Sequence, residues 1–236
     1  MEDPKVRVNC IYRATEGEGI AVGRPQIFIR LQGCRVGCRN CDSKETWDFG
    51  EGQEMEMDRV LGEVDGLADG NIRWVSLTGG DPLDPAHLKA LDVLIHRLAK
   101  RGYAVNLEAS GTRIVPEIFR RVDFISFDYK TPSTGVRTPV PLLLELSEHY
   151  LGKFQIKSVV EDEGDFHACL KAREELERAD CGIGFEWCLT PAYSPHERFD
   201  PARFTKIMSL NMEHGSRFRV IGQQHKWVYG PRQRRV

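Results

Sequence analysis

The sequence predicts an α/β fold in which parallel strands are joined by crossover helices. Short apolar segments rich in β-branched residues alternate along the chain with segments of helical period, an alternation typical of a parallel sheet. The chain has 236 residues, of which 41% are hydrophobic and 29% are charged, so its composition is that of a globular protein. No repeat or long linker divides it, and we expect a single domain over residues 1–236.

Seven segments have the length and composition of strands. They are residues 26–31, 72–77, 103–107, 123–127, 153–160, 182–188 and 217–221. Helical period marks residues 55–67, 85–100 and 166–178. Pro85 and Pro201 suit the first turn of a helix, with Asp84 and Asp200 as the preceding N-caps. The pattern leaves open whether the sheet closes into a barrel.

The charge balance and the apolar runs exclude several classes of protein. Lys and Arg number 33 against 35 Asp and Glu, a net charge of −2, whereas a protein that coats a nucleic-acid duplex is strongly basic. The first residues are charged and contain no apolar signal segment, and no apolar run approaches the ~18 residues needed to cross a bilayer. We therefore expect a cytoplasmic protein with no membrane span and no nucleic-acid partner.

The seven cysteines divide into two groups. An odd number without a signal segment argues against a disulfide framework. Four lie in or beside apolar segments, and we expect each to be a small buried hydrophobe: Cys10, Cys169, Cys181 and Cys188. The other three, Cys34, Cys38 and Cys41, lie in one short stretch with the spacing C-x3-C-x2-C. Three thiols at this spacing indicate a metal site.

Counting ligands favours one kind of metal site over the others. Structural zinc sites and electron-transfer [4Fe–4S] clusters both use four protein ligands. Three cysteinates leave one iron of a [4Fe–4S] cluster open to a small molecule, which favours a catalytic cluster. The alternative is a zinc site completed by Asp42 or by a distant His, because zinc also binds thiolates well.

Polar residues follow the predicted strands at the point where each strand ends. Cys34 follows residues 26–31, Gly79 and Gly80 follow residues 72–77, and Glu108 follows residues 103–107. Lys130 and His225 follow two later strands. Active groups of α/β sheets gather at the carboxyl ends of strands, so we expect these residues to surround the cysteines. Taken singly, the glycines are equally consistent with a tight turn, and the others with solvated loop residues.

These motifs together resemble the radical S-adenosylmethionine (SAM) superfamily and, more narrowly, the 7-carboxy-7-deazaguanine synthase family. The narrower resemblance rests on four stretches: TEGEG at 15–19, IFIRLQGC at 27–34, CDSKETW at 41–47 and QQHK at 223–226. It implies an incomplete TIM-like (β/α) barrel and a single radical SAM domain over residues 1–236. Two alternatives remain open: another small radical SAM enzyme such as a glycyl-radical-enzyme activase, and a structural metal-binding protein.

The resemblance implies a set of cofactor ligands. Cys34, Cys38 and Cys41 would hold a [4Fe–4S] cluster whose open iron binds SAM, so that the cofactors perform the hard chemical step. The SAM-binding residues would be Asn40, Cys41, Asp42, Gly80, Glu108, Ser110, Asp128, Tyr129 and Lys130. Family members often have Ser-Pro-Lys where this chain has Asp128, Tyr129 and Lys130. Mg²⁺ would bind at Ser43, where the family has Thr; both side chains offer the hydroxyl oxygen that this cation accepts.

The resemblance also implies a substrate, 6-carboxy-5,6,7,8-tetrahydropterin. Its ring would contract with loss of ammonia to 7-carboxy-7-deazaguanine, in 7-deazapurine and queuosine biosynthesis. A carboxylate needs a cation and a pterin edge needs carboxylate acceptors, which Arg30 and Glu18 would provide. The other substrate residues would be Thr15, Glu16, Gly17, Thr78 and His225. Glu16 stands where the family has Gln, and Thr190 where many members have Gln. Family members are commonly homodimers, and an electron donor such as flavodoxin or ferredoxin would reduce the cluster.

Overall fold

The computed structural model describes residues 3–179, 184–194 and 196–235, so Cys181 and the start of the predicted strand 182–188 lie outside the described residues. The strands are β1 (Val6–Thr15), β2 (Pro25–Leu31), β3 (Gln53–Met55), β4 (Trp74–Gly79), β5 (Ala104–Ala109), β6 (Phe124–Asp128), β7 (Phe154–Val160), β8 (Glu186–Pro191) and β9 (Arg219–Val220). The helices are α1 (Met57–Ala68), α2 (Leu88–Lys100), α3 (Pro116–Arg121), α4 (Val140–His149), α5 (Glu163–Arg178), α6 (Pro201–Glu213) and α7 (Gln224–Tyr229). Short 3-10 turns are η1 (Gly19–Ala21), η2 (Lys44–Thr46) and η3 (Pro132–Thr134).

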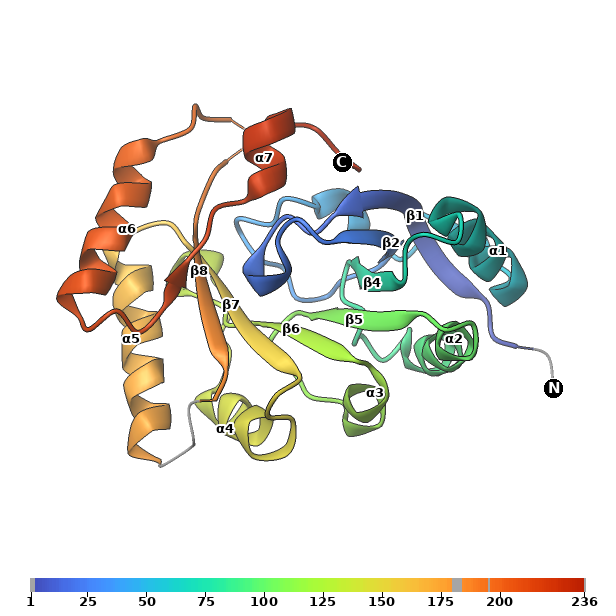
Figure 1. Cartoon of the computed structure of the whole chain (residues 1–236), viewed down its shortest axis with the longest axis horizontal. Helices are drawn as coiled ribbons and strands as arrows, with labels where there is room; N and C mark the ends of the chain where they lie inside the picture. The colour runs from blue at the N-terminus through green and yellow to red at the C-terminus, as the bar shows by residue number, and fades with distance from the viewer. Residues whose placement is uncertain (1–2, 180–183, 195, 236) are drawn as a thin grey trace.

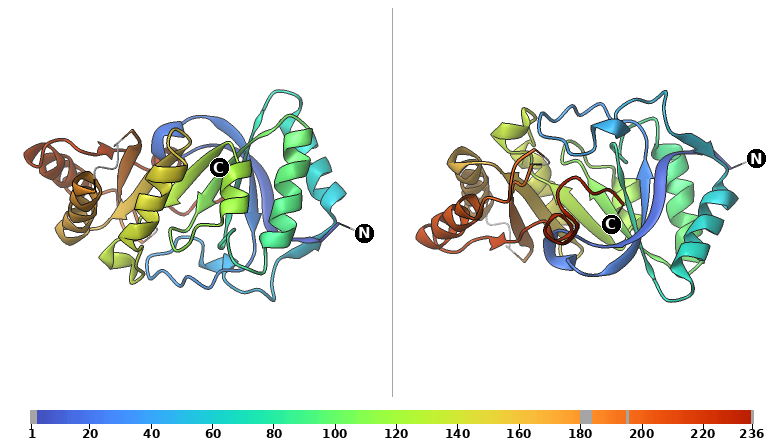
Figure 2. Two further views of the ribbon diagram at one scale, coloured as in Figure 1. Left: turned by 90° about the horizontal axis from the view of Figure 1, so that it is seen from below. Right: turned by 90° about the horizontal axis from the view of Figure 1, so that it is seen from above.

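The strands form one open sheet in the order β3-β1-β2-β4-β5-β6-β7-β8-β9. Neighbouring strands from β2 to β9 are parallel, whereas β1 pairs antiparallel with β2 and β3 pairs antiparallel with β1. Figure 1 shows helices α2 to α5 along the outer side of the curved sheet, and Figure 2 shows the same arrangement from below and above. The predicted α/β fold with an incomplete barrel of parallel strands is therefore confirmed.

Each predicted strand has an observed counterpart, but the sequence analysis missed the hairpin that precedes them. β1 carries Arg7, Asn9 and Arg13 among its apolar residues, and most of its positions are half-buried or exposed. β3 has only three residues and is formed by pairing with the start of β1, where Val6 faces Met55. Neither strand has the apolar, β-branched run by which the central strands were predicted.

One predicted helix cap is wrong and one is confirmed. α2 begins at Leu88 with His87 as its N-cap, so Asp84 does not cap this helix and Pro85 is not in its first turn. Asp84 instead accepts a hydrogen bond from the backbone N–H of Ala86 at 3.0 Å and pairs with Arg35. Its carboxylate therefore links two loops and is not available to cap the helix. Asp200 accepts from the N–H of Ala202 at 2.9 Å and caps α6, with Pro201 in the first turn.

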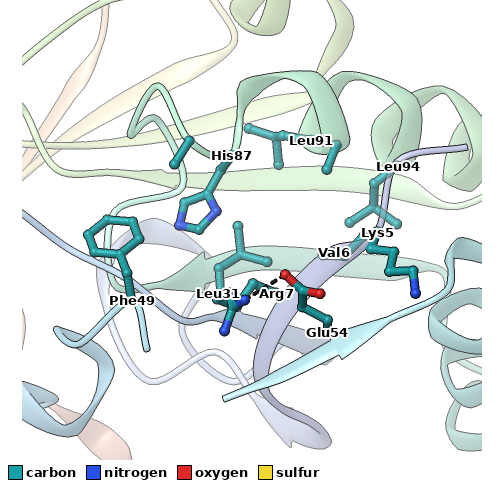
Figure 3. A pocket seen from close by; sticks show the side chains of 11 residues that line it. Lys5, Val6, Arg7, Leu31, Phe49, Glu54, His87, Leu91 and Leu94 are labelled. Atoms are coloured by element: carbon teal, nitrogen blue, oxygen red, sulfur yellow. Dashed lines mark hydrogen bonds and ion pairs between the residues drawn. The ribbon is translucent and has the colours of Figure 1, made fainter. Parts of the chain in front are cut away.

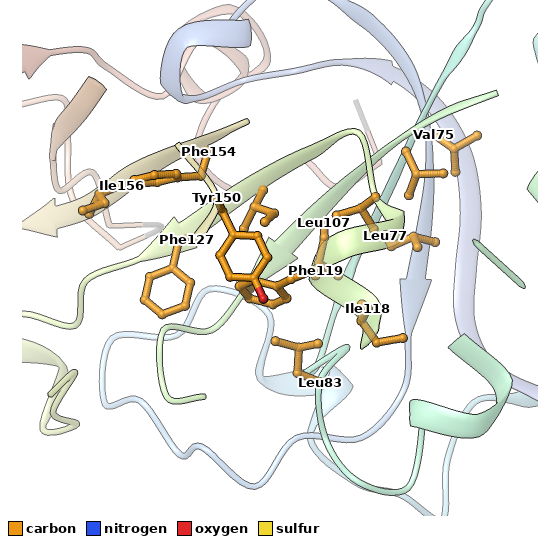
Figure 4. Packing of buried hydrophobic residues seen from close by; sticks show 14 of the residues in the cluster. Val75, Leu77, Leu83, Leu107, Ile118, Phe119, Phe127, Tyr150, Phe154 and Ile156 are labelled. Carbon is orange, nitrogen blue, oxygen red and sulfur yellow. The ribbon is translucent and has the colours of Figure 1, made fainter. Parts of the chain in front are cut away.

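The two faces of the central strands differ in chemistry. On the outer face, Val75, Leu77, Leu107 and Phe127 are fully buried against the helices, as Figure 4 shows. On the inner face, four buried polar side chains form a hydrogen-bonded row across β4 to β7: Ser76, Asn106, Ser126 and Gln155. Because side chains alternate along a strand, the residues two positions further along point to the same inner face. This polar row is the floor of the candidate site.

Within the described residues, no helix has both the length and the apolar character needed to span a membrane. α7 packs against the turn that follows β1, where the backbone N–H of Gln224 donates to the carbonyl of Gly17 at 2.9 Å. The C-terminal end of the described chain thus returns to its N-terminal strands, as Figure 1 shows.

Candidate active site

Five charged or polar side chains occupy the inner face directly above the polar row, at the carboxyl ends of β2 and β4 to β7. They are Arg30, Thr78, Glu108, Asp128 and Lys157. Arg30 lies opposite Thr78 and Asp128 lies opposite Lys157 in the strand register. The structure therefore brings four of the predicted site residues to one layer of the sheet, together with a lysine that the sequence analysis did not single out.

The cluster loop, residues 33–42, follows β2 and is held at both ends by backbone hydrogen bonds. The N–H of Gly33 donates to the carbonyl of Thr46 at 2.7 Å, and the N–H of Cys34 donates to Trp47 at 3.1 Å. At the far side the N–H of Arg39 donates to Thr134 at 2.8 Å. These contacts fix the loop over the ends of the strands, where the sequence analysis expected the cysteines.

The three thiols of the cluster loop are all free and half-buried. Burial raises the pKa of the Cys38 thiol, Lys130 opposes that rise, and Cys41 and Cys34 add to it, so the three thiols lie within electrostatic reach of one another. Among the described residues, no group of three or more His, Cys, Asp and Glu side chains is arranged so that it could hold a metal ion. The donor set nevertheless fits an iron–sulfur cluster, because iron binds thiolates and its positive charge favours the deprotonated thiol.

Gly80 packs directly against the cluster loop. Its N–H donates to the carbonyl of Leu31 at 3.1 Å, and the next N–H, of Asp81, donates to the carbonyl of Gly33 at 2.9 Å. A Cβ atom at Gly80 would lie 2.1 Å from that Gly33 oxygen. The Gly79–Gly80 pair is therefore more than a tight turn, since only a glycine allows this strand end to touch the loop.

Three further predicted SAM residues make polar contacts: Asn40 and Asp42 in the cluster loop, and Ser110 after β5. Asn40 donates to Glu161 at 2.8 Å, and Asp42 pairs with Lys226 of α7 at 3.2 Å. Ser110 is hydrogen-bonded to Thr112 at 3.0 Å. Two of these partners come from segments far away in the sequence: Glu161 directly follows β7, and Lys226 lies in α7.

The side chains of the predicted tripeptide at the end of β6, residues 128–130, point in two different directions. Lys130 pairs with Asp128 at 2.7 Å; burial alone would lower the pKa of Lys130, but Asp128 and the thiols of Cys38 and Cys41 raise it, so this cation faces the cluster loop. The ring of Tyr129 instead packs edge-on against Trp187, and its hydroxyl donates to the carbonyl of Ala168 in α5 at 3.3 Å. The structure therefore does not bring the Tyr129 side chain to the other site residues.

The turn after β1 contributes the next group of predicted residues, Thr15 to Glu18. Thr15 is exposed at the end of the strand, whereas Glu16 is buried. The Glu16 carboxylate accepts from the N–H groups of Gly17 at 3.0 Å and Glu18 at 3.3 Å, and from Gln26 at 2.7 Å. Both of its oxygens are used within the protein, so this side chain shapes the turn.

His225 lies directly over Gly17. A Cβ atom at Gly17 would be 2.0 Å from Nδ1 of the imidazole, which explains why the turn needs glycine here. Burial lowers the pKa of His225, although the Glu18 carboxylate acts against this. The QQHK stretch therefore contacts the TEGEG stretch, so two of the four stretches that carry the family resemblance meet in the structure.

Glu18 and Glu108 share one buried cation. Lys157 lies 2.6 Å from Glu108 and 3.4 Å from Glu18, and only 9% of its side chain is exposed. Glu18 also accepts a hydrogen bond from Gln223 at 2.6 Å. Burial would raise the pKa of Glu18, but Lys157, His225 and Gln223 lower it to about 2, so the carboxylate is ionised.

Arg30 contacts a residue of β1, and Ser43 lies next to the last cysteine of the cluster loop. Arg30 donates to the hydroxyl of Tyr12 at 3.0 Å, which leaves other N–H groups of its guanidinium for a ligand. The hydroxyl of Ser43 lies 3.6 Å from the Cys41 sulfur and its carbonyl accepts from Thr46 at 2.7 Å, so the hydroxyl oxygen stands beside the cluster loop.

Lys157 and Gln223 are the main residues of this site that the sequence analysis did not name as candidates. Lys157 is the only charged residue of β7, a strand that is otherwise mostly apolar and buried. A lysine in such a strand is a signal that could have been used, because a buried cation requires a partner. Gln223 gave no such signal, since its partner Glu18 lies 205 positions earlier in the chain.

The cysteines outside the cluster loop follow the expectation in part. Cys169 and Cys188 are buried, and burial raises the pKa of each thiol to about 12, as expected for small buried hydrophobes. Cys10 is only half-buried and lies opposite Arg30 in the pairing of β1 with β2.

A cavity of about 120 Å³ lies between the start of β1 and α2. Figure 3 shows His87 and Phe49 beside each other in its wall, with Leu31 and Leu91 nearby. None of the predicted site residues lines it, so this cavity is separate from the strand-end site.

Comparison with known proteins identifies relatives of this chain. Residues 15–117 match the family model of a 4Fe–4S single cluster domain. A 7-carboxy-7-deazaguanine synthase of Pyrobaculum aerophilum is 33% identical over 232 residues, which cover 96% of each chain. The enzyme of the same name from Halobacterium salinarum is 30% identical and covers 92% of this chain and 88% of its own.

Two solved structures have a fold similar to that of this chain. The crystal structure of QueE from Escherichia coli has a TM-score of 0.67 and 24% sequence identity, and the match covers 94% of this chain and 95% of that one. A radical SAM methyltransferase from Sphaerobacter thermophilus has a TM-score of 0.57 at 17% identity, with 84% of this chain and 66% of that chain covered. The extent of the sequence match to the curated relatives decides against a structural metal-binding protein, and the chain belongs to the 7-carboxy-7-deazaguanine synthase family of radical SAM enzymes.

Proposed function

We propose that this protein converts 6-carboxy-5,6,7,8-tetrahydropterin to 7-carboxy-7-deazaguanine with loss of ammonia. The observation that supports this most is the meeting of the cluster loop, Arg30 and two half-buried glutamates at one end of the sheet, in a chain of this family. The substrate has a carboxylate and a pterin edge rich in N–H donors. A cation and ionised carboxylates are the groups that bind such a molecule.

Cys34, Cys38 and Cys41 would hold the [4Fe–4S] cluster, and Asn40, Asp42, Gly80 and Lys130 would contact SAM. When bound, the cluster and SAM supply the one-electron chemistry that starts the reaction. Ser43 would bind Mg²⁺ through its hydroxyl oxygen. An electron donor such as flavodoxin or ferredoxin would reduce the cluster, and the protein would act as a homodimer.

The chain's own residues would orient the substrate. Arg30 would hold the carboxylate, Glu18 and Glu108 would accept from the N–H groups of the pterin, and Thr78 and His225 would close the pocket from either side. Because Glu18 is held ionised by its neighbours, it can accept hydrogen bonds across the whole physiological pH range.

An anaerobic turnover tests this proposal. Protein reconstituted with iron and sulfide is incubated with SAM, Mg²⁺, dithionite and 6-carboxytetrahydropterin, and the products are read by mass spectrometry. We expect 7-carboxy-7-deazaguanine and 5′-deoxyadenosine from the native protein and neither from Cys38→Ala, whose circular dichroism serves as the check on folding. Formation of 5′-deoxyadenosine alone by the native protein would contradict the proposed substrate. Formation of 5′-deoxyadenosine by Cys38→Ala would contradict the cluster ligands.

A further inference from the structure

Lys157 occupies a position where the charges of several strands meet. It lies on the inner face of β7, between Glu108 of β5 and Glu18 of the turn after β1. These two carboxylates belong to segments 90 positions apart in the sequence, and Lys157 is the cation that contacts both. The floor beneath it is the neutral polar row, of which Gln155 on the same strand is a member.

The surroundings of Lys157 are strongly acidic. The titratable groups that act on it or feel its charge come from the turn, the neighbouring strands and α7: Glu16, Glu18, Glu108, Asp128, Cys188 and His225. Glu108 is further fixed by Asn106, which donates to its second oxygen at 2.8 Å. Two ionised carboxylates cannot stay close together in a buried pocket without a cation between them, because each would repel the other and lose its hydration.

We propose that Lys157 is a positioning residue that holds the carboxyl groups of Glu18 and Glu108 where they can accept the N–H groups of the substrate. It does so through the two short contacts that its ammonium makes to their carboxylates. This inference rests on the proposed function, since it assigns Lys157 a role in binding the pterin. In the protein without substrate, removal of Lys157 takes away the cation that contacts both carboxyl groups. A carboxyl group of the site should then bind a proton at neutral pH.

Infrared spectroscopy of the apo-protein tests that statement without any activity. In Lys157→Met, which keeps the length of the side chain and removes the charge, we expect an added band of a protonated carboxyl group at neutral pH. Lys157→Gln should show the same band, because an amide carries no positive charge. Lys157→Arg should resemble the native protein, since a guanidinium can bind two carboxylates at once. Lys153→Met is the matched control: it is a lysine next to the same strand whose Nζ donates to the carbonyls of Arg120 and Val122, outside the site.

Kinetics give the second readout. In Lys157→Met the KM for 6-carboxytetrahydropterin should rise at least ~10-fold, as expected for the loss of a charge-assisted hydrogen bond to a ligand. The acidic limb of the pH profile of kcat/KM should move to higher pH, because a carboxylate without its cation binds a proton more readily. In Lys157→Arg the acidic limb should lie at the same pH as in the native protein. Lys153→Met should change neither the KM nor the pH of this limb.

The outcomes separate the two proposals. Absence of the carboxyl band in both Lys157→Met and Lys157→Gln, or a native pH limb in Lys157→Met, would overturn the role of Lys157. If the native protein forms no 7-carboxy-7-deazaguanine, the proposed function fails, and the infrared comparison still decides whether the charge of Lys157 acts on the carboxyl groups that it contacts. If Lys157→Met does not fold, Lys157→Gln carries the same test.

Discussion

At the scale of single residues, the site shows how two glutamates of one turn acquire opposite properties. Glu16 and Glu18 are two positions apart and both are buried from solvent in large part. Glu18 contacts Lys157 and accepts from Gln223, so its pKa falls to about 2. For Glu16, burial and the nearby Glu108 raise the pKa to about 7, and the more distant Lys157 offsets only part of this. The contacts of Glu18 therefore lower the pKa of one glutamate of the turn, whereas burial raises the pKa of the other.

This difference predicts how stability depends on pH. The pKa of Glu16 is about 7 in the folded protein and 4.5 in its reference state, so between these values the folded chain keeps a proton that the unfolded chain has lost. The stabilisation that this proton provides is complete below pH 4.5 and is lost as the pH rises to about 7. A shift of this size corresponds to ~3 kcal/mol.

Glu16→Gln removes the titrating group and keeps an oxygen for the N–H groups of the turn. We expect the Tm of this variant to vary less between pH 5 and pH 8 than the Tm of the native protein, and to exceed it at pH 8. Thermal unfolding of the apo-proteins at several pH values measures this. Parallel curves for the two proteins would show that Glu16 does not titrate in this range.

At the scale of helices and strands, the sequence predicted the parallel part of the sheet well because its strands are buried on both faces. β4 to β7 read as apolar runs, and their ends carry the polar residues that form the site. β1 could not be found in this way, since most of its positions are half-buried or exposed. The side-chain direction of Tyr129 was also beyond prediction, because it depends on the distant Trp187.

Contacts between elements limit what the strand ends can accommodate, and Gly80 gives a direct test. In Gly80→Ala the added Cβ would meet the carbonyl group of Gly33 at 2.1 Å, so the cluster loop must move. We expect a loss of ~1–3 kcal/mol in the free energy of unfolding, as is usual for overpacking, and less iron per chain after reconstitution.

Gly66→Ala in α1 is the control for this variant, because nothing lies within 4 Å of the Cβ that it adds. It should stabilise the protein by ~0.5–1 kcal/mol, since alanine is the better residue in a helix interior. Urea unfolding and iron analysis of both variants give the comparison. If Gly80→Ala bound as much iron as Gly66→Ala, the close contact between Gly80 and the cluster loop would not be needed for iron binding.

At the scale of the whole molecule, the described chain is closed by contacts between its two ends. Gln223 and His225 reach the turn after β1, Lys226 pairs with Asp42, and Arg234 contacts the carbonyl of Asp42 and pairs with Glu45 at 3.5 Å. The stretch QQHK was recognised from its resemblance to a family motif, but no local pattern states that it meets residues 17 and 18. Such long-range contacts follow from the curvature of the sheet, which brings β9 and the segment after it toward β1.

These end-to-end contacts differ in strength because they differ in burial. Lys226 is buried, lies 3.2 Å from Asp42 and donates to the carbonyl of Tyr193 at 3.2 Å. Lys226→Met should therefore lower the free energy of unfolding by ~1–3 kcal/mol, the range for hydrogen bonds that involve a charged group.

The pair of Arg234 and Glu45 is about half exposed on each side, with 53% and 47% of the side chains accessible. Deletion of residues 232–236 should cost less than ~1 kcal/mol, because exposed ion pairs contribute little. Urea unfolding of the two variants beside the native protein measures both values. An equal or larger loss on the deletion would show that the terminal arginines hold this end of the chain to the cluster loop at least as firmly as Lys226 does.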